Sequence, residues 1–122
     1  MYVSTRCLFP NFAITWLSVK NEPMLFPTKI FPKLTPEIIK ELDIEKGIES
    51  SMSAFLLEAE GKKALFDTGL NESASKGIPD RFKELKITPD EIDYIFITHF
   101  HEDHIGGLLD SKDNIVYKNA KV

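Results

Sequence analysis

The three histidines of this chain all lie within six consecutive positions. They are His99, His101 and His104, and Asp103 directly precedes the last of them, which gives the pattern HxHxDH. Side chains two residues apart on an extended segment point to the same side, so His99 and His101 can converge on one metal ion. Asp103 and His104 can hold a second ion a few ångströms away, because zinc and similar metals accept imidazole and carboxylate ligands. Chance clustering into this pattern is improbable, so the segment predicts metal binding.

The elements that must position these ligands can be predicted from the neighbouring residues. A β-branched and aromatic run at 92–98 predicts a buried strand that leads directly into the first histidine. Two apolar runs at 51–58 and 63–66 flank a short turn at Glu60-Gly61, which predicts a β-hairpin ending at Asp67-Thr68-Gly69. The two ligands closest to the C-terminus then fall at the start of the next helix. Strands that alternate with helices predict an α/β fold.

The remaining segments give further signals. Thr35 and Pro36 are typical of a helix start, and Gly47 of its C-cap. Apolar residues at 78, 82 and 85 predict an amphipathic helix, residues 88–91 form a capping-box pattern, and residues 12–19 predict a strand. Four prolines at 23–36 predict an ordered, extended arm, which we expect to lie as a strap over the core.

Composition narrows the classes of protein. The 122 residues are 43% hydrophobic and 28% charged, which fits one globular domain. The net charge of −4 disfavours binding to nucleic acid, and the longest uncharged stretch, at 7–19, is too short and broken to span a membrane. We therefore expect a small-molecule substrate, no nucleic-acid or membrane partner, and a cytoplasmic location.

The ligand pattern, followed by Gly106-Gly107, resembles the signature of the metallo-β-lactamase-fold superfamily. Asp67-Thr68-Gly69 matches its second landmark, and residues 108–110 and 117–122 look most like the lactonase and methyl-parathion-hydrolase-like branch. The likeness is good over 50–122, loose over 24–49 and absent over 1–20. It divides the chain into an unassigned segment at 1–20, a Pro-rich arm and helix at 21–49, and a partial metallo-β-lactamase-like domain at 50–122.

The resemblance implies the N-terminal half of an αββα sandwich with two zinc ions at the sheet edge. His99 and His101 would bind the first ion, Asp103 and His104 the second, and Asp103 would also hold the proton of the nucleophile. Asp67 would orient the ligand loop from behind. The implied activity is hydrolysis of ester, lactone or phosphotriester-like substrates by metal-bound hydroxide.

The family completes this site with histidines and an aspartate from a second half, but no histidine follows His104 here. Asp110 and Asp113 lie too close in sequence to bridge the metals and are interpreted as turn residues. Each ion then has two protein ligands, fewer than the usual three. We expect a truncated chain that binds metal weakly, is weakly active or inactive, and leaves the apolar run 52–57 partly exposed.

The sequence leaves open the source of the missing layer and two alternative functions. The missing layer could come from the C-terminal half or from a second copy in a homodimer. The chain could instead be a non-catalytic remnant or interaction module that keeps a partial metal site. A third reading is an iron-dependent redox protein of the same superfamily.

Overall fold

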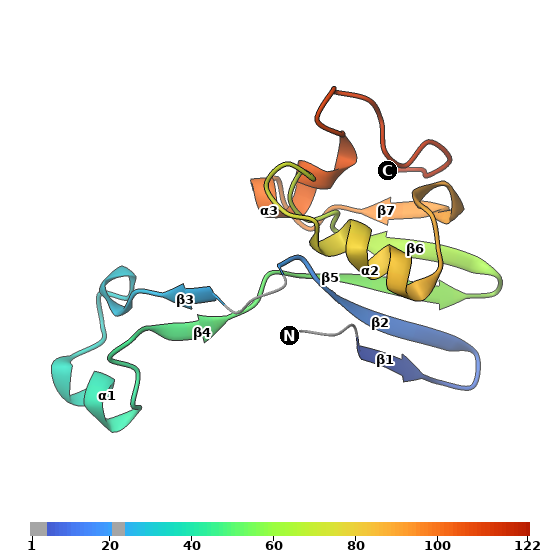
Figure 1. Ribbon diagram of the computed structural model, residues 1–122. Coiled ribbons are helices and arrows are strands. Elements are labelled where there is room, and N and C mark those ends of the chain that lie inside the picture. The colour runs from blue at the N-terminus through green and yellow to red at the C-terminus, as the bar shows by residue number, and fades with distance from the viewer. Residues whose placement is uncertain (1–4, 21–23) are drawn as a thin grey trace.

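A five-stranded sheet forms the centre of the molecule (Figure 1). The computed structural model describes residues 5–20 and 24–122. The strand order is β1-β2-β5-β6-β7, in which β1 to β6 pair antiparallel and β7 pairs parallel to β6. The strands are β1 (Thr5–Leu8), β2 (Phe12–Ser18), β5 (Ser53–Ala59), β6 (Lys62–Phe66) and β7 (Tyr94–Phe96). The predicted α/β class is therefore confirmed.

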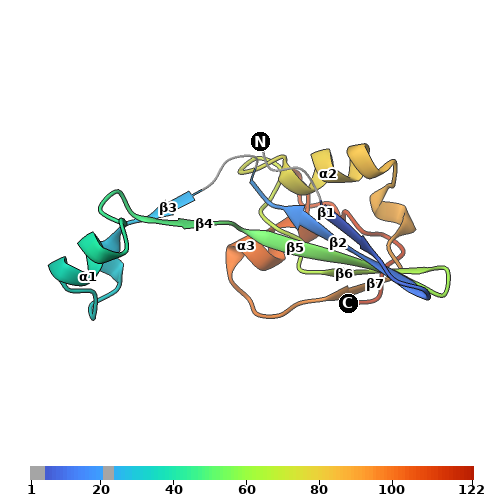
Figure 2. The same cartoon turned by 90° about the horizontal axis from the view of Figure 1, so that it is seen from below.

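Alternation along the strands separates the two faces of the sheet. Helix α2 (Gly77–Leu85) packs on one face (Figure 2) and buries Ile78 and Phe82 there. The strand residues on this face form the core, and those fully buried include Leu17, Leu56 and Leu65. The predicted amphipathic helix is confirmed, since its apolar stripe covers this core.

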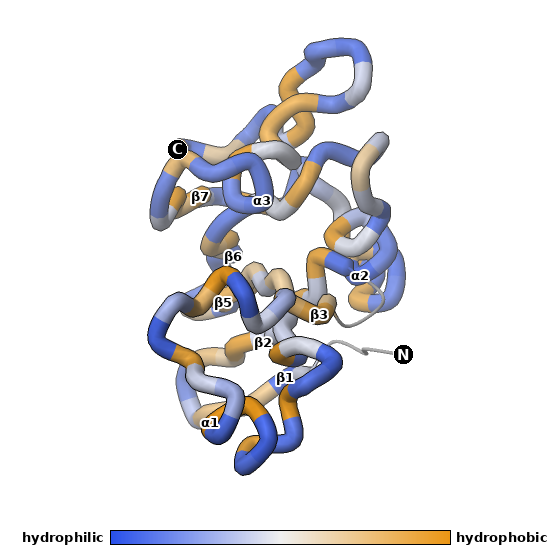
Figure 3. The backbone as a smooth tube through the Cα atoms, turned by 90° about the vertical axis from the view of Figure 1, so that its left-hand side faces the viewer, coloured by the Kyte–Doolittle hydropathy of each residue, from blue (hydrophilic) through white to orange (hydrophobic). Residues whose placement is uncertain are grey.

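The opposite face of the sheet keeps its apolar side chains partly in solvent. We call it the open face and define it by Ile14, Phe55, Leu57, Phe66 and Phe96. Phe55 is 44% exposed and Phe96 is 53% exposed. Exposure of the run 52–57 was expected and is confirmed. Figure 3 shows hydrophobic positions along the strands of this sheet.

Local turn chemistry explains how the hairpin and its neighbours form. Glu60 and Gly61 both have positive φ, 51° and 72°, as the right-handed twist of a tight hairpin requires. The hairpin predicted for 51–66 is therefore confirmed as β5 and β6. The capping box is also present, because Glu91 accepts a hydrogen bond from the Thr88 backbone N–H at 2.7 Å. A 3₁₀ turn at Pro89–Glu91 then leads into β7.

The expected strand at 92–98 is shorter than predicted. Only Tyr94–Phe96 pairs with β6, and Tyr94 and Phe96 are exposed while Ile95 is buried. Full burial was a wrong prediction, because helices cover one face of this sheet edge and the other face is open.

Residues 5–18, which carry no family likeness in sequence, form β1 and β2 of the same sheet. The strand predicted at 12–19 is β2, whose seven residues all pair with β5, from Phe12 with Ala59 to Ser18 with Ser53. Residues 1–4 lie outside the described part of the chain. The segment left unassigned from the sequence therefore supplies a central strand and an edge strand.

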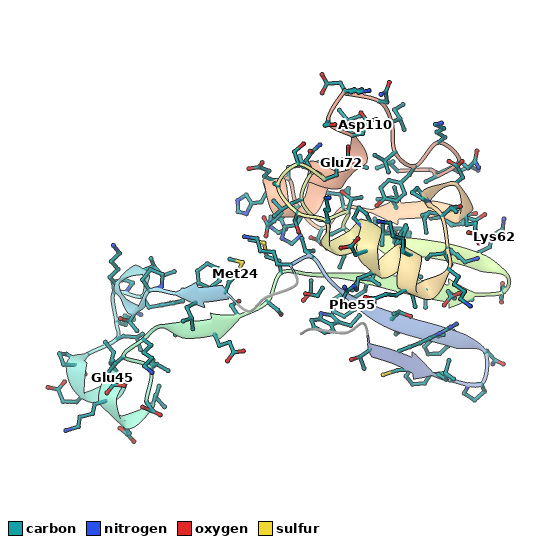
Figure 4. The ribbon with its side chains drawn as sticks, in the orientation of Figure 1. Met24, Glu45, Phe55, Lys62, Glu72 and Asp110 are labelled. Carbon is teal, nitrogen blue, oxygen red and sulfur yellow. The ribbon has the colours of Figure 1, made fainter. Side chains whose placement is uncertain are left out.

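A two-stranded arm extends away from the sheet (Figure 1). It consists of β3 (Met24–Phe26) paired with β4 (Ile48–Ser50), a 3₁₀ turn at Thr28–Ile30 and helix α1 (Pro36–Glu41). Glu45 lies near its tip (Figure 4). The expected strap over the core is therefore wrong for the described residues from Met24 onward. Residues 21–23 lie outside the described part.

The start of α1 was predicted correctly and its end was not. Thr35 caps the helix, since its Oγ1 accepts a hydrogen bond from the Ile38 N–H at 3.4 Å. The helix ends at Glu41, and Gly47 lies beyond it at φ 125° in the turn before β4. Its left-handed backbone serves that turn, where a Cβ would meet the Phe26 carbonyl oxygen at 2.8 Å. In the part of the chain that the structure describes, no helix is long and apolar enough to cross a membrane.

Candidate metal centre

The predicted ligands follow β7 at the edge of the sheet. His99 and His101 lie in the connection after this strand, and Asp103 and His104 lie in helix α3 (Glu102–Ile105). Asp67 follows the parallel neighbour β6. The carboxyl ends of parallel strands meet at one sheet edge, which brings the two sequence motifs together across more than 30 residues.

The first histidine pair presents two nitrogens to one point. Nε2 of His99 lies 3.1 Å from Nδ1 of His101. With zinc–nitrogen distances of about 2.0–2.1 Å and tetrahedral angles, two ligand atoms of one ion lie about 3.3 Å apart. The observed separation is close to that value, so this pair fits one metal ion.

The second pair has a similar spacing. Nε2 of His104 lies 3.4 Å from Oδ2 of Asp103, again near the separation for two ligands of one tetrahedral ion. The imidazole rings of His99 and His104 are adjacent, with centroids 3.8 Å apart. The two pairs therefore lie side by side.

The ligands come in pairs rather than in larger groups. Within residues 5–20 and 24–122, no group of three or more His, Cys, Asp or Glu side chains is arranged to hold one ion. The donor types fit zinc, but each pair falls one ligand short of the three that a catalytic zinc normally takes from protein. The assignment of two protein ligands to each ion stays a prediction.

Asp67 anchors the ligand loop from behind. Its Oδ1 accepts a hydrogen bond from the Thr98 N–H at 2.8 Å, and its Oδ2 lies 2.7 Å from Nδ1 of His104. Burial alone would raise the pKa of Asp67, but the hydrogen bonds from Thr98 and His104 outweigh it and hold this pKa below its usual value. Asp67 is thus an ionised, buried acceptor, and the orienting role that the family resemblance implies for it stays a prediction.

The backbone that follows Asp67 contacts α3 and the 3₁₀ turn after it, Gly106–Leu108. The Thr68 N–H donates to the carbonyl of His104 at 2.8 Å, and the Gly107 N–H donates to the carbonyl of Gly69 at 3.0 Å. A Cβ at Gly107 would meet the Thr68 carbonyl oxygen at 2.2 Å, so only glycine permits this approach. The second glycine of the motif thus allows close backbone packing beside the candidate ligands.

Sequence reasoning missed two parts of the site. Thr98 places its hydroxyl 2.8 Å from Oδ2 of Asp67. An apolar hollow of about 620 Å³ adjoins the ligands, and its lining includes Phe55, Leu57, Phe66 and His104. The alternation of β2 and β5 could have indicated the hollow, whereas the pairing of Thr98 with a residue 31 positions away left no local signal.

Asp110 lies in a turn, as predicted. Asp110 accepts hydrogen bonds from the N–H groups of Lys112 and Asn114 and closes a turn. Glu72 and Asp110 lie near the end of the molecule that carries α3, and Lys62 lies at the far end of the sheet (Figure 4). Asp110 therefore caps a loop.

Solved structures show the same fold over nearly the whole chain. A hydrolase of the β-lactamase superfamily, AbOPH, superposes with a TM-score of 0.81 at 24% identity, covering 100% of this chain and 44% of its own. The dizinc quorum-quenching lactonase AidC superposes with a TM-score of 0.81 at 21% identity, covering 97% of this chain and 43% of its own. The chain therefore spans less than half the length of these structures, and it has a partial fold of their type.

Sequence comparison points to the same superfamily. Exodeoxyribonuclease WalJ of Streptococcus pneumoniae is 42% identical over 59 residues, which are 48% of this chain and 21% of that protein. The family model described as the metallo-beta-lactamase superfamily matches residues 49–122, the segment that holds both the hairpin with its Asp-Thr-Gly turn and the histidine pairs. With its motifs, its sheet and this match in agreement, the chain belongs to the metallo-β-lactamase superfamily.

Proposed function

We propose that this chain carries part of a dinuclear zinc hydrolase site that acts on ester, lactone or phosphotriester-like substrates. The observation that carries the proposal is the pairing of donor atoms. His99 with His101, and Asp103 with His104, each have the spacing of two ligands on one ion. The structural neighbour AbOPH is a hydrolase, and zinc is the metal of the structural neighbour AidC.

In this proposal, each candidate residue has a role in metal binding or in proton transfer. The histidine pair holds the first ion, and Asp103 with His104 holds the second. Bound zinc supplies Lewis-acid polarisation of the substrate and a water acidic enough to react at neutral pH. Asp103 Oδ2 faces His104, so we assign Oδ1 of Asp103 to the proton of the attacking water.

The apolar hollow supports a small organic substrate. Phe55, Leu57 and Phe66 line it together with His104, so an acyl or alkyl group could lie against the open face while its ester group reaches the ligands. The net charge of −4 fits an uncharged substrate better than a polyanion.

Nuclease activity is a second candidate, favoured by the identity to WalJ over 59 residues. That likeness covers 48% of this chain and only 21% of WalJ. A nuclease would also need cationic side chains along a strand of nucleic acid, and the chain carries 15 Lys and Arg against 19 Asp and Glu. The charge balance therefore favours hydrolysis of a small organic substrate over nuclease activity.

The remaining ligands and the missing layer are proposed to come from outside these 122 residues, either from further chain or from a second copy. The open face gives this layer a place to pack, and it adjoins the ligand pairs. A chain without that layer would bind zinc weakly and turn over substrate slowly. If the chain shows no turnover, we would conclude that it is a non-catalytic module with a partial metal site.

Zinc titration by calorimetry tests the metal proposal. We expect weak binding that His99→Ala and Asp103→Asn each reduce at least about tenfold, because each removes one of two ligands. Glu102→Gln is the matched control, since this acid lies in the same helix but outside both pairs. Equal binding by the wild type and both ligand variants would reject the site.

A substrate panel then tests the reaction. The zinc-loaded chain is assayed with an acyl lactone, a nitrophenyl ester, an aryl phosphotriester and a single-stranded oligonucleotide. We expect slow lactone or ester turnover that Asp103→Asn abolishes, and no cleavage of the oligonucleotide. Oligonucleotide cleavage without lactone turnover would establish the nuclease reading instead.

A further inference from the structure

The hydroxyl of Thr98 lies among three side chains of the candidate centre. Its Oγ1 is 2.8 Å from Oδ2 of Asp67, 3.1 Å from Nδ1 of His99 and 3.3 Å from Nδ1 of His104. A hydroxyl has one proton to donate and lone pairs to accept. The neighbours therefore decide which of the three contacts it donates to.

The proton positions follow from Asp67. An ionised carboxylate only accepts, so the Thr98 hydroxyl donates to it. His104 Nδ1 lies closer to Asp67 than to Thr98, 2.7 Å against 3.3 Å, and therefore donates its own proton to the carboxylate. The lone pair of Thr98 is then left to accept from Nδ1–H of His99.

We propose that Thr98 is a positioning residue that relays Asp67 to His99, so that one carboxylate fixes the tautomer of a histidine in each ligand pair. Both rings then carry their proton on Nδ1, and both Nε2 atoms keep their lone pairs. Nε2 of His99 is the atom that faces His101, and Nε2 of His104 is the atom that faces Asp103. The relay thus leaves the metal-facing Nε2 atom in each pair unprotonated and able to bind a metal ion.

The position of Thr98 does not depend on its hydroxyl. Its backbone N–H donates to Oδ1 of Asp67 at 2.8 Å, a bond that Val or Ser at this position can also make. Thr98→Val therefore removes the relay with little change in shape, and Thr98→Ser restores the hydroxyl. Thr68→Val is a matched control, because Thr68 Oγ1 donates to the backbone carbonyl of His104 at 3.0 Å and contacts no ring nitrogen.

The test is nuclear magnetic resonance of the metal-free chain with ¹⁵N-labelled histidine. Long-range proton–nitrogen spectra at about pH 8.5, about two units above the pKa of a histidine model peptide, report which ring nitrogen carries the proton. We expect Nδ1–H on His99 in the wild type, Thr98→Ser and Thr68→Val. In Thr98→Val, His99 should shift towards Nε2–H, the form that predominates for histidine in water, while His104 keeps Nδ1–H.

Two results would overturn the relay. One is an Nε2–H tautomer of His99 in the wild type, which needs no variant and is independent of whether Thr98→Val folds. The other is an unchanged His99 tautomer in a folded Thr98→Val chain. The relay itself is tested without metal, whereas its consequence for zinc rests on the proposed function.

Zinc affinity separates the two claims. Loss of an orienting partner behind a metal ligand typically costs about 10- to 100-fold in affinity, so we expect Thr98→Val to weaken zinc binding by that factor and Thr98→Ser to restore it. A shifted tautomer with unchanged zinc affinity would support the relay and refute its role at the metal centre.

Discussion

Oδ2 of Asp67 lies 2.7 Å from Nδ1 of His104, although 37 residues separate the two in sequence. This contact joins the Asp-Thr-Gly turn after β6 to the helix that presents the second ligand pair. It explains why the two motifs occur together, because the turn supplies the charge that orients a ligand in the other.

Asp67→Asn should weaken zinc binding by about 10- to 100-fold. The amide keeps the shape but loses the charge that holds the Nδ1 proton of His104. Calorimetry compares this variant with Asp93→Asn, which removes a carboxylate bonded to Lys62 and to the backbone of Lys63. Equal losses in both variants would mean that any removed carboxylate weakens binding, against a specific role for Asp67.

Acid should destabilise the chain partly through Asp67. A carboxyl whose pKa is lower in the folded than in the unfolded state stabilises the fold above its unfolded pKa, and this stability is lost as the pH falls through the folded pKa. Because the pKa of Asp67 lies below its ordinary value of 3.8, the loss should occur below about pH 4.

Urea unfolding at pH 6 and pH 3 measures this effect. The wild type should lose stability between the two values, and Asp67→Asn should lose less, because it has no charge to neutralise. Other carboxyl groups with lowered pKa, such as Asp93 and Asp110, keep part of the slope in both chains. An identical pH slope in the two chains would contradict the assignment.

Gly107→Ala should destabilise the fold by about 1–3 kcal/mol, the usual cost of forcing a group into a packed site. The added Cβ would meet the Thr68 carbonyl oxygen at 2.2 Å and push the turn after β6 away from α3. Gly61→Asn is the control, since nothing lies within 4 Å of a Cβ there and Asn tolerates positive φ. Thermal unfolding of both variants measures the difference, and equal midpoints would show that the turn and α3 can separate without cost.

The open face should promote self-association of the isolated chain. Phe55→Gln reduces the exposed apolar surface at the centre of this face and should lower the concentration-dependent association seen by sedimentation velocity. Ile30→Gln is the matched control, because Ile30 is 51% exposed and belongs to the arm, which extends away from the sheet. If the arm variant alone lowers association, the arm is the contact between copies.

Local sequence signals predicted the elements that local chemistry determines. The hairpin followed from two apolar runs and a Gly-containing turn, the start of α1 from Thr35 and Pro36, and α2 from its spacing of Ile78 and Phe82. The four candidate ligands lie within six residues, so the sequence alone brings them close together, and their role in metal binding stays a prediction.

Predictions failed where distant packing decides the outcome. The arm projects because β3 pairs with β4 rather than with the central sheet, and proline content alone cannot distinguish the two. Gly47 looked like a helix C-cap, but the helix ends at Glu41 and its C-cap residue is Leu42. Thr98 gave no signal, because its partner Asp67 becomes its neighbour only through the parallel pairing of β6 and β7.

The hollow on the open face has a thermodynamic consequence. Its lining includes Phe55 and Leu57 and also Asp67 and His104, so any layer that packs on the sheet also touches the ligand loop. Zinc binding and docking of that layer are then linked equilibria. By reciprocity, the factor by which the layer tightens zinc equals the factor by which zinc tightens the layer. Bound zinc would thus stabilise the association of the two halves of the sandwich, in addition to its proposed role in hydrolysis.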